Sequence, residues 1–244
     1  MTARIKLLGI LLGWTVPALW THAASVVIGG SALATTEGST GSNSGGFLGS
    51  NNFTSQYQIV STDLAAQGLV IGSTILGVRA RLQETATMTG DRTISDFEIT
   101  LAQAANPFGS MSTSYAGNMV NPVLVRDGAY TFFDAQMPEG SIPNAFGQLV
   151  TFSSPYVYQG GDLIFMFSRP AITGGGAVTT DSHDGGGVVV QRLLTNSFHA
   201  TTGTLGTAFS VLQLEFTAVP EPSRVLLIAV GLLSLGFARC RKCA

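Results

Sequence analysis

Apolar and polar residues alternate at every second position in three stretches of this chain, and this period of two constrains the fold more than any other feature. The stretches are 76–82, 97–101 and 211–216. Successive side chains of a strand point to opposite faces, so each stretch is predicted to be a half-buried strand. In the first, Arg79 and Arg81 are expected on the solvent face. No part of the chain between its two ends shows the 3.6-residue period of an amphipathic helix.

Shorter apolar runs predict further strands at 26–28, 123–126, 129–133, 148–152, 163–167 and 188–194. The dipeptide Asp127-Gly128 favours a tight hairpin between the second and third of these. The run 163–167 is apolar enough for a central strand, and 106–118 could include one helical turn. Eight or more short strands separated by Gly, Pro, Asn and Asp predict an all-β fold, a β-sandwich of jelly-roll type. This domain is expected over 47–217, after a Gly/Ser/Thr-rich segment, 25–46, that is a flexible leader or an edge strand.

The N-terminus has the three parts of a secretory signal peptide, expected over residues 1–24. Arg4 and Lys6 form a basic region, an apolar core follows over 7–20, and small residues close the segment. Cleavage by the general secretion machinery is expected after Ala23 or Ala24.

The C-terminal segment 218–244 contains a proline-flanked acid, an apolar run and a basic end. The apolar run 225–238 would form a helix of roughly 21 Å. That is shorter than the roughly 30 Å hydrocarbon core, so a single short transmembrane helix can span only marginally. The basic residues of 239–244 place this end in the cytoplasm and the bulk of the chain outside.

Together these parts, with Val-Pro-Glu-Pro-Ser at 219–223, resemble the PEP-CTERM sorting signal of Gram-negative bacteria. The resemblance covers about a tenth of the chain. It implies a membrane-embedded transpeptidase, the exosortase, as a partner that recognises Pro220, Glu221 and Pro222. It further implies an inner-membrane-anchored precursor that reaches the cell surface or the exterior. Arg224 and the two cysteines depart from the family pattern, and an ordinary tail anchor is the alternative.

Charge argues against a nucleic-acid partner. Six arginines and thirteen acids lie between residues 25 and 217, with no lysine, for a formal charge of −7. Such a domain gains no counterion-release attraction to nucleic acid, and anionic lipid repels it, so membrane association is expected from the tail alone. Cys240 and Cys243 are the only cysteines of the chain, so the domain is expected to fold without disulfides.

No motif for a catalytic triad, a zinc hydrolase, a phosphate loop or a dinucleotide site is found between the two signals. Asp181 and Asp184, followed by three glycines, could wrap a Ca²⁺. The interpretation favoured here is a solvated turn without a cofactor. His199 is interpreted as a surface or structural histidine rather than a metal ligand.

Aromatic residues in predicted loops suggest a second kind of site. Exposed rings of Tyr156 and Tyr158 could stack on the sugars of an extracellular polysaccharide, although the favoured interpretation is that they cover the end of the core. The expected function is that of an exported, non-enzymatic surface or matrix protein, structural or adhesive in a polysaccharide biofilm. The alternatives are a carbohydrate-binding module and a secreted hydrolase, the latter requiring acids such as Asp181 and Asp184 to converge in a concave site.

Overall fold

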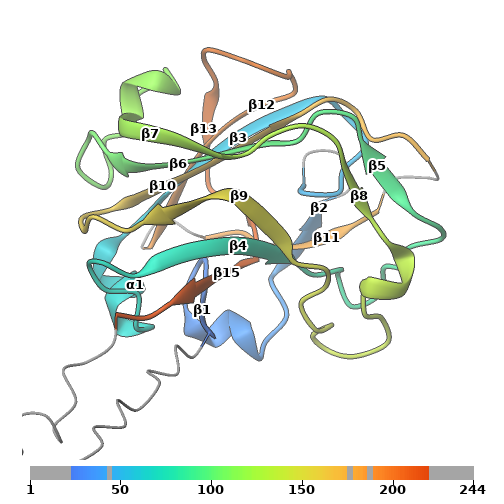
Figure 1. Ribbon diagram of the computed structural model, residues 1–244. Helices are drawn as coiled ribbons and strands as arrows, with labels where there is room; N and C mark the ends of the chain where they lie inside the picture. The colour runs from blue at the N-terminus through green and yellow to red at the C-terminus, as the bar shows by residue number, and fades with distance from the viewer. Residues whose placement is uncertain (1–22, 43–45, 175–177, 186–188, 220–244) are drawn as a thin grey trace, which may run out of the picture. The chain divides into compact units, whose positions relative to one another are not determined.

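The computed structural model describes residues 23–42, 46–174, 178–185 and 189–219 (Figure 1). Strands dominate this part of the chain, which confirms the all-β prediction. The strands are β1 Ala23–Val27, β2 Thr40–Ser42, β3 Phe53–Ile59, β4 Thr74–Ala80, β5 Arg92–Ile94, β6 Glu98–Ala104, β7 Met119–Arg126, β8 Tyr130–Phe132, β9 Val150–Val157, β10 Leu163–Arg169, β11 Thr180–His183, β12 Val190–Thr195, β13 Thr204–Gly206, β14 Phe209–Ser210 and β15 Leu212–Thr217. The short helices are α1 Ser61–Ala66 and the 3₁₀ turns η1 Ser31–Ala34, η2 Ala116–Asn118 and η3 Asp134–Gln136.

Two larger sheets form a sandwich-like arrangement. One has the strand order β1-β15-β4-β9 and the other the order β13-β12-β3-β10-β6-β7. Two small sheets, β14-β11-β2 and β5-β8, complete the set among the described residues. Neighbouring strands pair antiparallel throughout. The apolar run 163–167 lies in β10, inside the larger sheet, as its composition predicts.

The inner faces of the two larger sheets share one hydrophobic core. Ile75, Val78 and Phe216 from the smaller sheet belong to the same buried cluster as Phe165 and Phe167 from the larger. Aromatic rings meet edge to face in this core, and each such pair adds roughly 0.5–1.5 kcal/mol beyond the burial of its area. Sharing a single core is what makes the two sheets one folding unit.

The outer face of the six-stranded sheet is also covered, by the segment that joins β6 to β7. Gln56 and Gln58 of β3 point to this face and are buried. The Nε2 of Gln56 donates to the carbonyl of Tyr115 at 3.0 Å, and the Nδ2 of Asn118 donates to the Oε1 of Gln56 at 2.8 Å. The expected helical turn of 106–118 is η2, which positions Asn118. The side chain of Gln56 is therefore hydrogen-bonded by this loop, whereas the Oε1 of Gln58 is buried without a partner among the described residues.

A bulge in β4 shifts the alternation predicted for 76–82. Ile75 pairs with Phe216 of β15 and Gly77 pairs with Glu215, which leaves Leu76 as the extra residue of β4 between two paired positions. Ile75 therefore points into the core, while Leu76 is only half-buried. An extra residue in one strand reverses the face of every position beyond it, which a strict period of two does not anticipate.

The prediction that Arg79 and Arg81 both lie on the solvent face is wrong for Arg81. Arg81 is fully buried, whereas Arg79 is partly exposed and pairs with Glu215.

The predicted hairpin at Asp127-Gly128 is also wrong. The strands on either side of this turn do not pair with one another, because β7 pairs with β6 and β8 pairs with β5. The turn therefore connects two sheets, and the carbonyl of Gly128 accepts from the amide of Phe97 at 2.9 Å instead of closing a hairpin.

The segment 25–46 contributes defined elements where the structure describes it. β1 is the edge strand of the four-stranded sheet, η1 follows, and β2 pairs with β11. Residues 1–22, which belong to the expected signal peptide 1–24, and residues 220–244, with the apolar run 225–238, lie outside the described residues. Within the described ranges no helix is long and apolar enough to cross a membrane.

Candidate functional site

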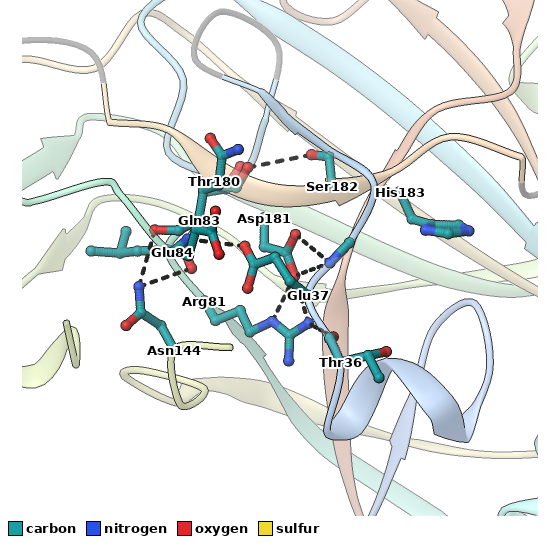
Figure 2. Close-up of polar contacts among 12 residues, drawn as sticks. Thr36, Glu37, Arg81, Gln83, Glu84, Asn144, Thr180, Asp181, Ser182 and His183 are labelled. Atoms are coloured by element: carbon teal, nitrogen blue, oxygen red, sulfur yellow. Dashed lines mark hydrogen bonds and ion pairs between the residues drawn. The ribbon is translucent and has the colours of Figure 1, made fainter. Parts of the chain in front are cut away.

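Asp181, one of the two acids considered as calcium ligands, is buried in an ion pair (Figure 2). The Nη2 and Nε of Arg81 lie 2.6 Å and 2.7 Å from its Oδ2. The side chains of both residues have no exposed area. The Nη2 of Arg81 also donates to the carbonyl of Thr36 at 2.6 Å, and its guanidinium lies 5.0 Å from the ring centre of Phe146. Burial of the two charges together requires this dense set of contacts, because each alone would be costly to remove from water.

Backbone pairing holds the two charged residues opposite one another. The amide of Asp181 donates to the carbonyl of Arg81 at 3.0 Å, and an isolated bridge joins the neighbouring residues Leu82 and Thr180. On the other side, the amide of Val211 donates to the carbonyl of Asp181. Strand β11 thus lies between the end of β4 and the start of β15, which places Asp181 beneath the surface.

The Gly/Ser/Thr-rich segment closes over this ion pair. The amide of Gly38 donates to both carboxylate oxygens of Asp181, at 3.0 Å and 3.2 Å. A Cβ at Gly38 would lie 2.2 Å from the carbonyl oxygen of Ser182, so only glycine allows this approach. Both oxygens of Asp181 are therefore engaged by protein donors, which leaves them poorly placed for a calcium ion.

Glu37 adds a second carboxyl group next to the pair. Its Oε1 accepts from the amide of Glu84 at 3.0 Å, while its Oε2 is buried without a partner among the described residues. Burial raises the pKa of Glu37 above its ordinary value, and the nearby charge of Asp181 adds to the rise. Burial likewise raises the pKa of Asp181, against the opposing effect of Arg81. In this buried cluster the guanidinium of Arg81 lies near two carboxyl groups, those of Asp181 and Glu37.

Asp184, the other candidate calcium ligand, is not part of this buried cluster. It is exposed, and its Oδ1 accepts from the Oγ1 of Thr207 at 2.6 Å. In the described part of the chain, Asp181 and Asp184 do not belong to a group of three residues whose ligand atoms converge. The two acids are thus divided between a buried ion pair and a surface turn.

The tyrosines considered for sugar stacking are both buried, at 5% exposure for Tyr156 and 4% for Tyr158. The hydroxyl of Tyr158 donates to the carbonyl of Gly161. Tyr156 forms part of the wall of a hollow of about 360 Å³, and Tyr158 part of another of about 530 Å³. Neither ring presents an open face, which agrees with the interpretation that they cover the end of the core.

The residues assigned to processing lie at the two ends of the described chain. Ala23 and Ala24 are the first residues of β1 and pair with Thr217 and Phe216 of β15. Pro220, Glu221 and Pro222 lie outside the described residues. The last described strand ends three residues before Pro220.

One convergent group was missed by the interpretation of the sequence. The Nε2 of His199 lies 2.8 Å from the Oε1 of Glu98, and ligand atoms of Asp96, Glu98 and His199 all lie within 4.8 Å of one another. Glu98 is the first residue of β6, and Asp96 lies two residues before it, just outside the strand. Two acids at this spacing are common in sequences, and His199 is 101 positions from Glu98, so the chain itself carries no local signal of the group.

A row of hydroxyl groups explains how His199 reaches Glu98. Thr54 of β3, Ser168 of β10 and Glu98 of β6 stand opposite one another across three strands. The loop after β12 runs along this row: the Oγ1 of Thr54 donates to the carbonyl of Ser197 at 2.7 Å, and the amide of His199 donates to the Oγ of Ser168 at 3.0 Å. Thr54 and Ser168 are buried beneath the loop, and these two hydrogen bonds hold the loop on the sheet.

No family model matches this chain, and no curated protein matches it either.

Proposed function

We propose that this chain is an exported protein sorted by an exosortase, which acts without catalysis as a structural or adhesive component of the cell surface or of a polysaccharide matrix. The observation that carries the proposal is the extent of the folded unit. Residues 23–219 belong to one compact unit, which contains the whole stretch between the two expected sorting signals. A domain that is complete between its signals can lose both without losing its fold.

Pairing at the edge of the four-stranded sheet is compatible with removal of the N-terminal signal, at the loss of the pairs made by Ala23 and Ala24. Cleavage after Ala24 would leave Ser25, Val26 and Val27 paired with Glu215, Leu214 and Gln213. Val26 and Val27 are buried in the core. The new N-terminus would then begin inside β1, and most of that strand would remain anchored.

The surface charge supports a location away from nucleic acid and anionic lipid. None of the six arginines is exposed: four are buried and two are half-buried. The exposed acids are Glu84, Asp91, Asp127, Glu139 and Asp184. A surface with acids and no exposed arginine or lysine favours solubility and repels polyanions.

We further infer a jelly roll, as the finer form of the sandwich. Leaving out β12, β13 and the two small sheets, eight strands remain in the larger sheets. Counted along the chain, the first, eighth, third and sixth form one sheet, and the second, seventh, fourth and fifth form the other. This order is that of a chain folded as two Greek keys, the arrangement found in jelly rolls.

Expression in a host with and without an exosortase tests the sorting proposal. With the enzyme, the intact mass should show loss of both terminal segments, and the protein should leave the inner membrane. Without it, the full tail should persist in the membrane fraction. Glu221→Ala should retain the tail even with the enzyme, whereas the exposed acid Glu139, changed to alanine, should be processed normally. Persistence of the full tail in both hosts would refute the proposal and leave an ordinary tail anchor.

A further inference from the structure

Asp96, Glu98 and His199 present two carboxylates and one imidazole to a common point at the surface. An ion placed between three atoms no more than 4.8 Å apart lies within about 2.8 Å of each, against the 2.0–2.2 Å of zinc–ligand bonds. A closure of less than about 1 Å per ligand would complete the bonds, a movement available to partly exposed side chains.

The imidazole is held in place before any ion arrives. Its ring stacks on Phe198 with centroids 3.6 Å apart and planes inclined by 28°. The backbone of His199 is left-handed, with φ of 55°, an uncommon conformation for a residue other than glycine. The hydroxyl of Ser168 accepts from the amide of His199 and fixes this backbone. Preorganised ligands lose less freedom on binding and so bind more tightly.

The electrostatic surroundings favour a cation. The carboxylate of Asp96 has no hydrogen-bond partner within the described part of the chain, and Glu98 is bonded to His199. No arginine is exposed on the described surface, and the domain has no lysine to compete for these carboxylates.

We propose that Asp96, Glu98 and His199 bind one Zn²⁺ ion. An imidazole nitrogen disfavours the hard cations Ca²⁺ and Mg²⁺, which prefer oxygen ligands. Two carboxylates and one imidazole suit zinc, which ranks above Mn²⁺ and Fe²⁺ and below Cu²⁺ in affinity for such sites. Three protein ligands leave the fourth position of a tetrahedral ion open, and the His199 side chain is 54% exposed, so that position faces water.

Titration of the metal-free chain with zinc chloride tests the site. Cys240 and Cys243 of the full-length chain are zinc ligands by their chemistry, so both are replaced by serine in every sample. Calorimetry in detergent should show one equivalent of zinc bound by this background chain. Asp96→Asn, Glu98→Gln and His199→Gln should each weaken binding by at least the 10- to 100-fold that removal of a supporting residue costs at known sites.

Asp127→Asn and His183→Gln are the matched controls, since both residues lie outside the group, and each should leave zinc affinity unchanged. Asp96→Asn guards against a folding defect, because the Asp96 carboxylate makes no hydrogen bond within the described part of the chain. The proposal is overturned if the background chain takes up no zinc, if the three variants bind as it does, or if the controls lose affinity equally.

Discussion

Arg81 is a fully buried cation whose charge is balanced by the carboxylate of Asp181. A period of two assigns Arg81 to the face of β4 opposite the core, and that assignment is correct for Arg79. Beyond the end of β4, however, β11 and the segment around Gly38 cover the second face as well. The counter-charge, Asp181, lies 100 positions later in the chain, so no local pattern could predict the pair.

Loss of Arg81 should be far more costly than loss of its neighbour. Arg81→Met leaves Asp181 as a buried carboxylate without its cation, which is expected to lower the free energy of unfolding by about 3–5 kcal/mol. Arg79→Met removes an ion pair whose side chains are 31% and 20% exposed, and about 0–1 kcal/mol is expected. Urea denaturation of the two variants measures the difference, and equal losses would contradict the buried pair.

The strands were the part of the fold best predicted from sequence. Alternation located β4, β6 and β15, and apolar content identified β10 as a central strand. Strand partners were harder to predict, because β7 and β8 follow one another across Asp127-Gly128 and yet belong to different sheets. A turn signal records that the chain reverses, whereas the choice of partner is made by strands distant in sequence.

The segment between β6 and β7 is held on the outer face of the larger sheet by buried side-chain amides, among them those of Gln56 and Asn118. Asn118→Ala should lower the free energy of unfolding by about 1–3 kcal/mol, since it leaves the Oε1 of Gln56 without its donor in a dry environment. Asn51→Ala, at an exposed position, should change it by no more than about 0.5 kcal/mol. Thermal or chemical denaturation gives both values. An Asn118 variant as stable as the Asn51 variant would show that the segment adds little to the fold.

At the scale of the whole molecule, one core joins the two larger sheets, and no cysteine lies between residues 25 and 217. The domain should therefore unfold in a single cooperative transition that is insensitive to reductant. Calorimetric scans with and without dithiothreitol should give the same Tm to within about 1 °C, a smaller shift than 1 kcal/mol would cause. Two resolved transitions would contradict the shared core.

The candidate site could be predicted only where it is local. The sequence predicts a solvated turn at Asp181 and Asp184, which is correct for the exposed Asp184 but wrong for Asp181, because Asp181 lies in β11 and is fully buried. Gly38 lies in a segment predicted to be a flexible leader or an edge strand, and its contact with Asp181 could not be predicted locally. The group of Asp96, Glu98 and His199 depends on the strand order β12-β3-β10-β6. It also depends on the hydroxyls of Thr54 and Ser168, which hold the loop after β12 across these strands. Such a group arises from the assembled sheet and has no counterpart in any single stretch of the chain.

The pairing of Ala23 with Thr217 places the first and last strands of the domain side by side, so its two ends are adjacent and a link between them would make the backbone a closed ring. Antiparallel neighbours stand about 5 Å apart, so a short glycine linker could join β15 to β1 without disturbing either strand. The ring could then be opened at another exposed turn, such as Asp127-Gly128, to give a circular permutant with the same core. The core would therefore be the same whether the backbone is interrupted between β15 and β1 or at an exposed turn.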